Sequence, residues 1–393
     1  MKKPGLVSAD QRFMRRAIEL AERGVGETNP NPPVGCVLVR NGRVVGEGFH
    51  ARAGSPHAEA IALARAGVRA KGATAYVTLE PCAPHSAKRT PPCAPRLVEA
   101  GVARVVFGVR DFNPNVRGEG ARLLRAAGVE VEEGVGAPAV ARLTAHFNLA
   151  MRNHRPFVVL KAGMTLDGCT ATAKGESKWI TSSAQRAAAR NLRRLFDGVL
   201  VGYETARQDD PMLLPEPRTV RPHARVVLDS HLRLPLDSRL VQSARRNPLI
   251  VIGAEPAPQH RRHALEGRGV TVITVDGRGG RVSIEAALAA LFDHGLRSLL
   301  VEGGSEVLGS FVRERRFDEM VIFRAPLILG GRGSRPVVGG ANPAVLKDAV
   351  PMRRASLETS AILRYGLGDP LALEVEVYER RPDGRAARKH QET

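Results

Sequence analysis

The segments HAEA (57–60), TLEPCAPH (78–85) and RTPPC (89–93) decide the fold of the first half of this chain. His57 opens an alanine-rich helix that we expect over 58–66. Cys82 directly follows a strand expected over 74–79, and Cys93 lies at the start of a helix expected over 92–100. The segments therefore bring one histidine and two cysteines to strand–helix junctions of an α/β sheet.

These three side chains have the chemistry of a zinc site. One imidazole and two thiolates supply three ligands of a tetrahedral zinc ion and leave the fourth position for water, which is typical of catalytic sites. Bound zinc lowers the pKa of such a water to about 7. Glu59 lies two residues after His57 and can move protons beside the metal without binding it. This division of roles is that of the zinc-dependent nucleobase deaminases.

The spacing of the cysteines differs from that of the deaminase signature, which has two residues between them. Here the ten residues 83–92 separate Cys82 from Cys93. The alternative is that both are ordinary core cysteines near a surface histidine. The ordered occurrence of His-x-Glu and two Pro-Cys pairs favours the metal site. Cys36 and Cys169 have no such partners and are interpreted as core or near-site residues.

Helices and strands are predicted to alternate on both sides of the zinc segments. Asn41-Gly42 between two strand-like runs, 34–38 and 44–48, is a hairpin signal. Further elements predict an α/β domain over residues 1–152 that ends in one closing helix. Its remaining expected elements are helices at 10–23, 120–127 and 137–152 and strands at 102–109 and 129–132.

A second alternating series predicts another α/β domain over residues 153–380, followed by a basic tail, 381–393, that we expect to be disordered. Strands are expected at 157–161, 198–202, 225–229, 249–253, 270–275, 298–301, 320–325 and 371–377, and helices at 183–196, 284–294 and 305–313.

A strand that ends in Gly303-Gly304 and is followed by a helix is suited to phosphate, because helix N-termini bind anions. No G-x-G-x-x-G fingerprint follows the first strand of this domain, which disfavours a Rossmann fold. Asp209-Asp210-Pro211 is either a pair of metal ligands or a helix-ending turn, and we favour the turn.

Composition bounds the function further. A net charge of +19 suits either nucleic acid or phosphorylated small molecules, although a GC-rich genome would also give many arginines. Aromatic residues make up only 4% of the chain, which leaves few base-stacking platforms. The four cysteines favour a reducing, cytoplasmic setting, and we expect no signal peptide and no membrane span.

Together with NPNPPVG (29–35), the zinc segments resemble the bifunctional deaminase–reductases of riboflavin biosynthesis, which have the wide cysteine spacing. The resemblance covers nearly the whole chain and implies a cytidine-deaminase-like α/β/α sandwich first. It implies His57, Cys82 and Cys93 as zinc ligands and Glu59 as the catalytic proton shuttle. The substrate residues it implies in this half are Asn31, His50, Arg89 and Asn113. The loop after Cys82 is two residues longer than the family pattern, and Ala83-Pro84-His85 stands where Ser-His is expected.

The second half resembles the reductase of the same family, which has a dihydrofolate-reductase-like α/β fold and uses NADPH. The resemblance implies that substrate contacts come from Ser177, Arg193, Leu213 and Glu302. It implies cofactor contacts from Gly163, Trp179, Thr205, Asp209, Ser230, Gly304, Ser305, Glu306, Val307, Leu308, Gly309 and Ser310. The family pattern D-D-P-x-L-T-x-R is altered here, because Leu214 replaces its threonine and Glu216 its arginine. Arg218 is a candidate substitute for that arginine.

The resemblance implies deamination of 2,5-diamino-6-ribosylamino-4(3H)-pyrimidinone 5′-phosphate by zinc hydroxide, then NADPH-dependent reduction of the ribosyl group to a ribityl group. Phosphorylated small molecules are the expected partners, without nucleic acid or membrane, and we expect a homo-oligomer. One alternative is a tRNA or nucleic-acid base deaminase with a basic C-terminal RNA-binding module. Another is a non-catalytic zinc fold beside a nucleotide-binding domain, in which Glu59 would be unnecessary.

Overall fold

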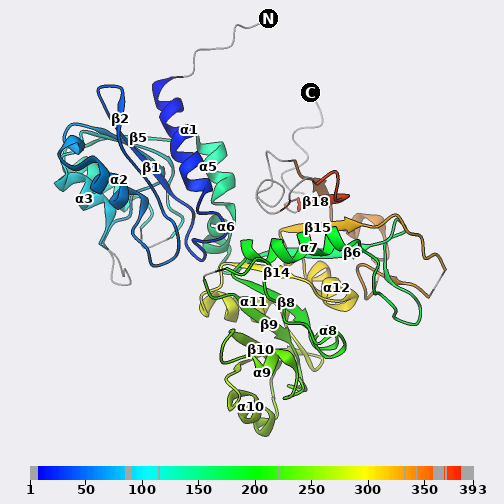
Figure 1. Ribbon diagram of the computed structural model, residues 1–393. Coiled ribbons are helices and arrows are strands. Elements are labelled where there is room, and N and C mark those ends of the chain that lie inside the picture. The colour runs from blue at the N-terminus through cyan, green and yellow to red at the C-terminus, as the bar shows by residue number, and fades with distance from the viewer. Residues whose placement is uncertain are drawn as a thin grey trace, which may run out of the picture. The chain divides into compact units, whose positions relative to one another are not determined.

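The computed structural model describes residues 8–84, 91–113, 116–219, 221–331, 333–341, 343–356, 367 and 370–381. The chain divides into two compact units, Met1–His154 and Arg155–Thr393, and each builds its own sheet (Figure 1). The predicted two-domain α/β fold class is confirmed. No helix in the described part of the chain combines the length and the apolar character needed to cross a membrane.

The first unit has a five-stranded sheet of order β2-β1-β3-β4-β5. β1 pairs antiparallel with β2 and β3, whereas β3, β4 and β5 are parallel. The strands are β1 Gly35–Arg40, β2 Arg43–Phe49, β3 Thr74–Leu79, β4 Arg104–Val109 and β5 Glu130–Glu133. The helices are α1 Ala9–Glu22, α2 Ala58–Ala66, α3 Cys93–Glu99, α4 Glu119–Ala126, α5 Ala137–Leu143 and α6 Ala145–Asn153, with a 3₁₀ turn at Gly67–Ala70.

Alternation along the strands builds two cores in this unit. Val37 and Val39 of β1 pack with α1 and α5 on one face, while Cys36 and Leu38 pack with α2, α3 and α4 on the other. Figure 1 shows the sheet between these two helical layers, so the predicted α/β/α sandwich is confirmed. The predicted hairpin at Asn41-Gly42 is also confirmed, with both residues at positive φ (51° and 73°) as a type I′ turn requires.

The predicted single helix over 137–152 is wrong, because the chain forms two helices that meet at Thr144. The Thr144 hydroxyl donates to the carbonyl of Val140 at 2.9 Å and accepts from the Asn148 amide at 2.7 Å. This side chain competes with the regular helical pattern at the junction.

The second unit has a nine-stranded sheet of order β11-β10-β9-β8-β14-β6-β15-β18-β17. From β11 to β15 in this sheet order, neighbouring strands are parallel. At the other edge, β18 pairs antiparallel with β15, and β17 pairs antiparallel with β18. The strands are β6 Phe157–Met164, β8 Gly198–Gly202, β9 Ala224–Leu228, β10 Leu249–Ala254, β11 Thr271–Val275, β14 Ser298–Val301, β15 Glu319–Arg324, β17 Met352–Arg354 and β18 Val375–Arg380. Short pairs form from β7 Cys169–Ala171 with β16 Arg335–Pro336 and from β12 Gly277–Arg278 with β13 Arg281–Val282.

Helices cover both faces of this sheet, and each face has its own apolar cluster. The helices are α7 Ser183–Leu192, α8 Tyr203–Asp209, α9 Arg239–Gln242, α10 Gln259–Glu266, α11 Ile284–Asp293 and α12 Ser305–Arg313, with 3₁₀ turns at Arg193–Leu195 and Leu346–Asp348. The carboxyl ends of parallel strands lie at one edge of a sheet, where α/β proteins bind their ligands. Gly202 ends β8, and Ser230 and Glu302 come shortly after β9 and β14, so all three lie at that edge.

Two predicted elements of the second unit are wrong at their ends. The helix expected over 183–196 stops at Leu192 and continues as a 3₁₀ turn. The strand expected over 371–377 begins at Val375, because residues 371–374 form a turn in which Glu374 has a φ of 51° and Leu371 is exposed. The expected disorder of 381–393 lies outside the described residues beyond Arg381.

Candidate active sites

The first site forms in the first unit, where β3 ends beside the starts of two helices. His57 is the N-cap of α2, Cys93 is the first residue of α3, and Cys82 lies in the segment that follows β3. The ligand atoms of these residues all lie within 4.8 Å of one another. Cys82 and Cys93 lie 25 and 36 positions after His57 in sequence, and they reach one point because β3 leads to Cys82 beside the starts of both helices.

The distances fit a metal ion. The Nδ1 atom of His57 lies 3.6 Å from the Sγ of Cys82 and 3.4 Å from the Sγ of Cys93. Zinc bonds of about 2.3 Å to sulfur and about 2.0 Å to nitrogen, at a tetrahedral angle, separate a nitrogen from a sulfur ligand by about 3.5 Å. The backbone N–H of Cys93 also donates to the Cys82 sulfur at 3.3 Å, as expected for a thiolate ligand. The donor set and its spacing both fit zinc.

Glu59 occupies the first turn of α2 beside these ligands and is buried. Burial raises the pKa of its carboxyl group, and the negative charge of Cys82 acts in the same direction. Cys36 is fully buried in the core under α2, where burial also raises the pKa of its thiol. Cys169 lies on β7 in the other domain.

Asn31 and His50 gather beside His57. The His50 ring packs edge-on against the His57 ring, with 5.5 Å between centroids. His50 Nδ1 lies 3.2 Å from the carbonyl oxygen of Pro56, and its Nε2 lies 3.4 Å from the amide nitrogen of Asn31. Burial lowers the pKa of His50. The neutral ring therefore donates from Nδ1 to the carbonyl and accepts at Nε2 from Asn31, which fixes the orientation of the Asn31 amide.

Glu80 is a residue to which the sequence analysis gave no role. Its buried carboxylate accepts backbone N–H bonds from Asp111 at 3.2 Å, Gly118 at 3.0 Å and Ala121 at 3.1 Å. Asp111 in turn accepts the backbone N–H of Asn113 at 2.8 Å. Glu80 thus ties the loop that carries Asn113 to the segment that carries Cys82. Its position before Pro-Cys gives no local signal of these long-range bonds.

Arg89 and His85 lie outside the described residues, within the gap 85–90. The sequence prediction that Arg89 contacts the substrate therefore stays a prediction.

The second site is a groove of about 1170 Å³ at the carboxyl edge of the reductase-like sheet. It collects residues that follow β6, β8, β9 and β14, together with the first turns of α12. Most predicted cofactor residues line it: Gly163, Thr205, Asp209, Ser230, Gly304, Ser305, Glu306, Val307, Leu308 and Ser310. Gly309 does not line the groove, and an added Cβ there would lie 2.0 Å from the carbonyl oxygen of Gly339.

Glu302 is the charged centre of this groove. Arg193 pairs with its carboxylate through Nε at 2.7 Å and Nη2 at 3.1 Å, and the Lys161 ammonium lies 3.4 Å away. Although burial opposes ionisation, Arg193 and Lys161 lower the pKa of Glu302 to about 2. The Glu302 carboxylate and the Lys161 ammonium both line the groove.

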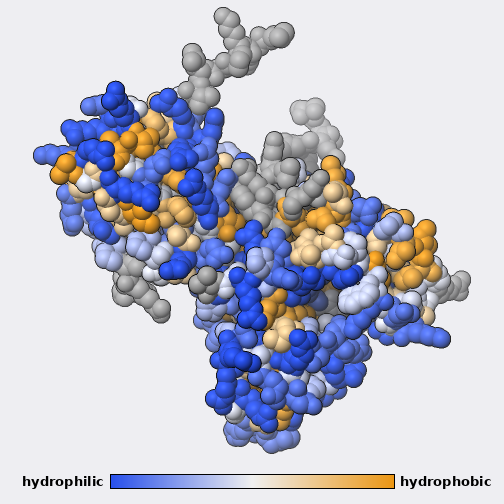
Figure 2. All heavy atoms as spheres, viewed as in Figure 1, coloured by the Kyte–Doolittle hydropathy of each residue, from blue (hydrophilic) through white to orange (hydrophobic). Residues whose placement is uncertain are grey.

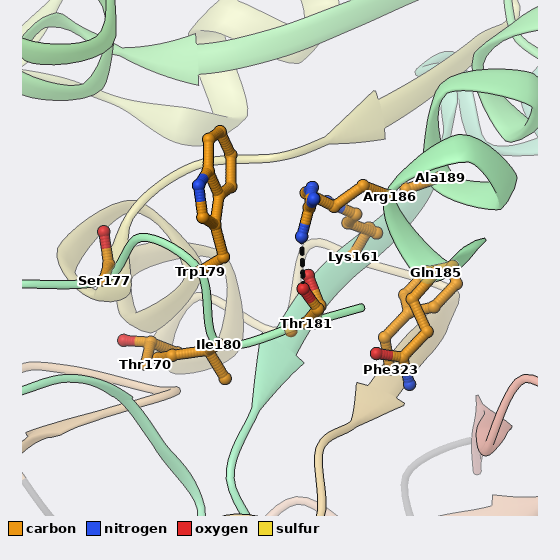
Figure 3. A pocket seen from close by; sticks show the side chains of 11 residues that line it. Lys161, Thr170, Ser177, Trp179, Ile180, Thr181, Gln185, Arg186, Ala189 and Phe323 are labelled. Carbon is orange, nitrogen blue, oxygen red and sulfur yellow. Dashed lines mark hydrogen bonds between the residues drawn. The ribbon is translucent and has the colours of Figure 1, made fainter. Parts of the chain in front are cut away.

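Trp179 lines a smaller adjoining pocket with Lys161, Gly163 and Ser177 (Figure 3). A lone tryptophan is usually a core residue, but 68% of this one is exposed. The guanidinium of Arg186, on α7, lies 4.3 Å from the centre of its ring, and donates to the carbonyl of Thr181. Arg186 is a second residue to which the sequence gave no role, because the stacking depends on how α7 meets the loop before it.

The segment that follows α8 contains the residues at which this chain departs from the family pattern. Asp209 ends α8 and Asp210 is its left-handed C-cap, so the predicted helix-ending turn is confirmed. The Leu213 side chain is buried in a core cluster and does not line the groove. The Leu214 carbonyl accepts from Arg193 at 2.9 Å, and Glu216 forms an ion pair with Arg190. The Glu216 carboxylate is therefore paired with Arg190 on α7.

Comparison with protein-family models gives two matches. The family described as RibD C-terminal domain matches residues 156–361. The family described as cytidine and deoxycytidylate deaminase zinc-binding region matches residues 7–109. The second match contains His57, Glu59, Cys82 and Cys93.

Curated proteins and solved structures agree with these matches. The riboflavin biosynthesis protein RibD of Actinobacillus pleuropneumoniae is 40% identical over 92% of this chain and 96% of its own length. That of Escherichia coli K12 is 39% identical over 82% and 89%. The structure of Acinetobacter baumannii RibD superposes with a TM-score of 0.81 at 35% identity, over 95% of this chain and 99% of that one. A diaminohydroxyphosphoribosylaminopyrimidine deaminase/5-amino-6-(5-phosphoribosylamino)uracil reductase from Thermotoga maritima gives a TM-score of 0.76 at 35% identity, with the same coverage.

Proposed function

The chain belongs to the RibD family and is a deaminase and reductase of riboflavin biosynthesis, and from this premise we propose how its residues serve the two reactions. The nucleic-acid alternative is not favoured, because the relatives match over most of the chain. The reactants are small molecules. A homo-oligomeric state and a cytoplasmic location stay predictions.

In the first domain, His57, Cys82 and Cys93 would hold a zinc ion, which would supply an activated water near neutral pH. The substrate is 2,5-diamino-6-ribosylamino-4(3H)-pyrimidinone 5′-phosphate, and water replaces its ring amine. Glu59 accepts a proton from the water and returns protons to the ring nitrogen and to the departing ammonia. The buried position of Glu59 beside three ligands spaced for zinc is the observation that carries this proposal.

Asn31 and His50 orient the pyrimidine. The bond between the Asn31 amide and His50 leaves the carbonyl oxygen of Asn31 for donors on the base. Asn113 contacts the same substrate from the loop that Glu80 anchors, and Arg89 contributes charge for the phosphate. Each of these contacts is a proposal that rests on position and on the family pattern.

In the second domain, the groove would hold NADPH, which would supply the hydride for conversion of the ribosyl group to a ribityl group. The turn at Gly304–Glu306 binds a cofactor phosphate through backbone N–H groups at the start of α12. The rest of the cofactor path is lined by Gly163, Thr205, Asp209 and Ser230. Trp179 lines the pocket next to it. Val307, Leu308 and Ser310 continue along the helix, whereas Gly309 lets α12 pack closely on the segment at Gly339.

In the second domain, the substrate contacts Ser177 and Glu302. Arg193 orients Glu302 and adds positive charge for the substrate phosphate. Leu213 contributes through its backbone, because its side chain is buried. Arg218 remains a candidate for the missing family arginine, since Glu216 pairs with Arg190.

The test is to incubate zinc-quantified protein with the diaminopyrimidinone phosphate, with and without NADPH. Ammonia release and loss of NADPH absorbance are followed together. We expect ammonia without NADPH, and NADPH oxidation only after ammonia has formed. Ammonia without NADPH oxidation would place the fault in the altered 213–218 segment. If neither signal arose from zinc-loaded protein, the substrate assignment would be wrong.

A further inference from the structure

The loop that carries Trp179 lines the smaller pocket, which shares Lys161, Gly163 and Ser177 with the cofactor groove (Figure 3). The indole ring of Trp179 is largely exposed, although an aromatic ring of this size is usually covered. An exposed ring beside a groove suits contact with a ligand, and such a contact is stronger when the ring is held in place before the ligand arrives. Trp179 therefore needs a partner within the protein that fixes its orientation.

The first turn of α7 is a rigid base for such a partner. Ser182 and Gln185 form a reciprocal capping box, in which each side chain accepts the backbone N–H of the other, at 3.2 and 2.9 Å. The buried Gln185 amide also donates to the carbonyl oxygens of Arg324 and Leu373, at 2.9 Å each. These bonds fix the start of α7 to the end of β15 and to the turn before β18. Arg186, the next residue, therefore extends from a backbone that is held in place.

Arg186 makes two contacts with the loop. Its guanidinium lies 4.3 Å from the centre of the Trp179 ring and donates to the carbonyl oxygen of Thr181, as the dashed line in Figure 3 marks. Thr181 in turn packs close to β6, because an added Cβ at Gly163 would lie 2.7 Å from its methyl carbon. Arg186 thus holds both the ring and the backbone of the loop beside the strand that lines the groove.

The charge of Arg186 serves this stack rather than an ion pair. Arg190, one turn further along α7, pairs with Glu216. Among the residues that the structure describes, Arg186 has no carboxylate within salt-bridge distance. A planar guanidinium attracts an indole face by charge and also packs flat against it, and the ammonium of lysine reproduces only the first of these.

We propose that Arg186 is a positioning residue of the reductase, which holds the Trp179 ring ready to pack against the bound cofactor. This inference rests on the proposed function, because it takes NADPH as the occupant of the groove. A ring that is already oriented loses little further freedom when the cofactor binds, whereas a free ring must first be ordered. Stacking of an exposed guanidinium on tryptophan changes an equilibrium constant about two- to fivefold, which is the size of the expected effect.

The first test needs no ligand. Trp179 is the only tryptophan of the chain, so the tryptophan fluorescence of the full-length protein reports this ring alone. Its anisotropy is measured in the wild type, Arg186→Ala, Arg186→Lys and the control Arg268→Ala. Arg268 is an exposed arginine just after α10, where Figure 2 shows a mainly hydrophilic surface, and it lines neither the pocket nor the groove. We expect a lower anisotropy in Arg186→Ala, an intermediate value in Arg186→Lys and the wild-type value in Arg268→Ala.

The second test follows reduction of the deaminated pyrimidine substrate by the same four proteins at varied NADPH. The KM for NADPH should rise about two- to fivefold in Arg186→Ala, while kcat and the KM for the pyrimidine stay unchanged, because the stack supports cofactor binding in the ground and transition states alike. Arg186→Lys should recover part of the loss, and Arg268→Ala should match the wild type.

Unchanged anisotropy in Arg186→Ala would overturn the proposal. A lower urea midpoint with the wild-type KM for NADPH would also overturn it, because Arg186 would then serve stability alone. A rise only in the KM for the pyrimidine would assign Arg186 to the substrate instead. If the wild type itself oxidised no NADPH, the proposed function would be wrong, whereas the anisotropy values would still decide whether Arg186 orients Trp179.

Discussion

Glu59 is the side chain that separates a catalytic zinc fold from a structural one. His57, Cys82 and Cys93 would hold zinc in either case, because the three ligand atoms already converge. A purely structural site has no use for a buried carboxylate beside the metal, since burial of an acid is costly without a compensating role. The position of Glu59 in the first turn of α2 therefore has its explanation in proton transfer.

Replacing Glu59 with glutamine should lower the rate of ammonia release by about 10²- to 10⁴-fold, because the shape is kept and the proton shuttle is lost. Zinc content should stay at the wild-type level. The control is Glu99→Gln, which changes an exposed carboxylate on α3. Ammonia assays and metal analysis of the same samples check this. Wild-type turnover in Glu59→Gln would exclude Glu59 as the proton carrier.

At the level of elements, α2 carries His57 to the proposed metal site because β2 lets the helix approach closely. An added Cβ at Gly48 would lie 2.3 Å from the carbonyl oxygen of Ala58, the residue between His57 and Glu59. Gly46 makes a similar approach to Ala62, with 2.3 Å between an added Cβ and its carbonyl oxygen. The two glycines therefore set the position of the helix that carries a zinc ligand and the proton shuttle.

Gly48→Ala should push α2 away from the sheet and lower the free energy of unfolding of the first domain by about 1 to 3 kcal/mol, as overpacking does. Zinc affinity should fall with it. Denaturant unfolding and zinc titration measure the two effects. Gly42→Asn is the control, because Gly42 has open space around it and asparagine tolerates its positive φ. Unchanged zinc affinity in Gly48→Ala would mean that β2 does not position His57.

Local patterns predicted the elements well where the residues themselves carry the signal. The alanine-rich α2, the apolar β3, β8 and β14, and the Asn-Gly hairpin all have their predicted places. The predicted elements were wrong where one side chain interrupts the helical periodicity, as Thr144 does between α5 and α6. The apolar spacing of 371–377 predicted a strand, but the chain turns at Glu374 before β18 begins.

The candidate sites divide in the same way. The convergence of His57, Cys82 and Cys93 could be predicted because each sits in a short segment with a characteristic neighbour, such as Pro-Cys or His-x-Glu. The roles of Glu80 and Arg186 could not, because each depends on contacts between segments distant in sequence or on helix placement.

At the scale of the whole molecule, His223 should make the second domain sensitive to mild acid. Burial of its ring lowers its pKa to about 3 in the folded chain, against about 6.5 when unfolded, so the unfolded chain takes up a proton first as the pH falls. The stabilisation is complete above pH 6.5 and is lost progressively toward pH 3. Between pH 7.5 and 5 most carboxylates stay ionised, so histidines dominate the change in charge, and comparison with His223→Gln isolates the contribution of His223.

The free energy of unfolding of the second domain should therefore decrease between pH 7.5 and 5, by about 1.4 kcal/mol per pH unit well below 6.5. His223→Gln should show a shallower slope over this interval, even if its stability is lower throughout. Urea unfolding followed at several pH values measures both slopes. Equal slopes in the two proteins would place the acid sensitivity elsewhere.

The two domains have separate apolar cores, since the clusters of the first sheet share no residue with those of the second. Removal of zinc should therefore abolish ammonia release and leave the reductase working on substrate that has already been deaminated. Chelator-treated enzyme is assayed for both activities, and zinc is then restored as the control. If NADPH oxidation of the deaminated substrate fell in parallel with ammonia release and returned with zinc, the reductase site would depend on the metal-bound domain. Sustained NADPH oxidation would instead establish that each sheet supports its own site.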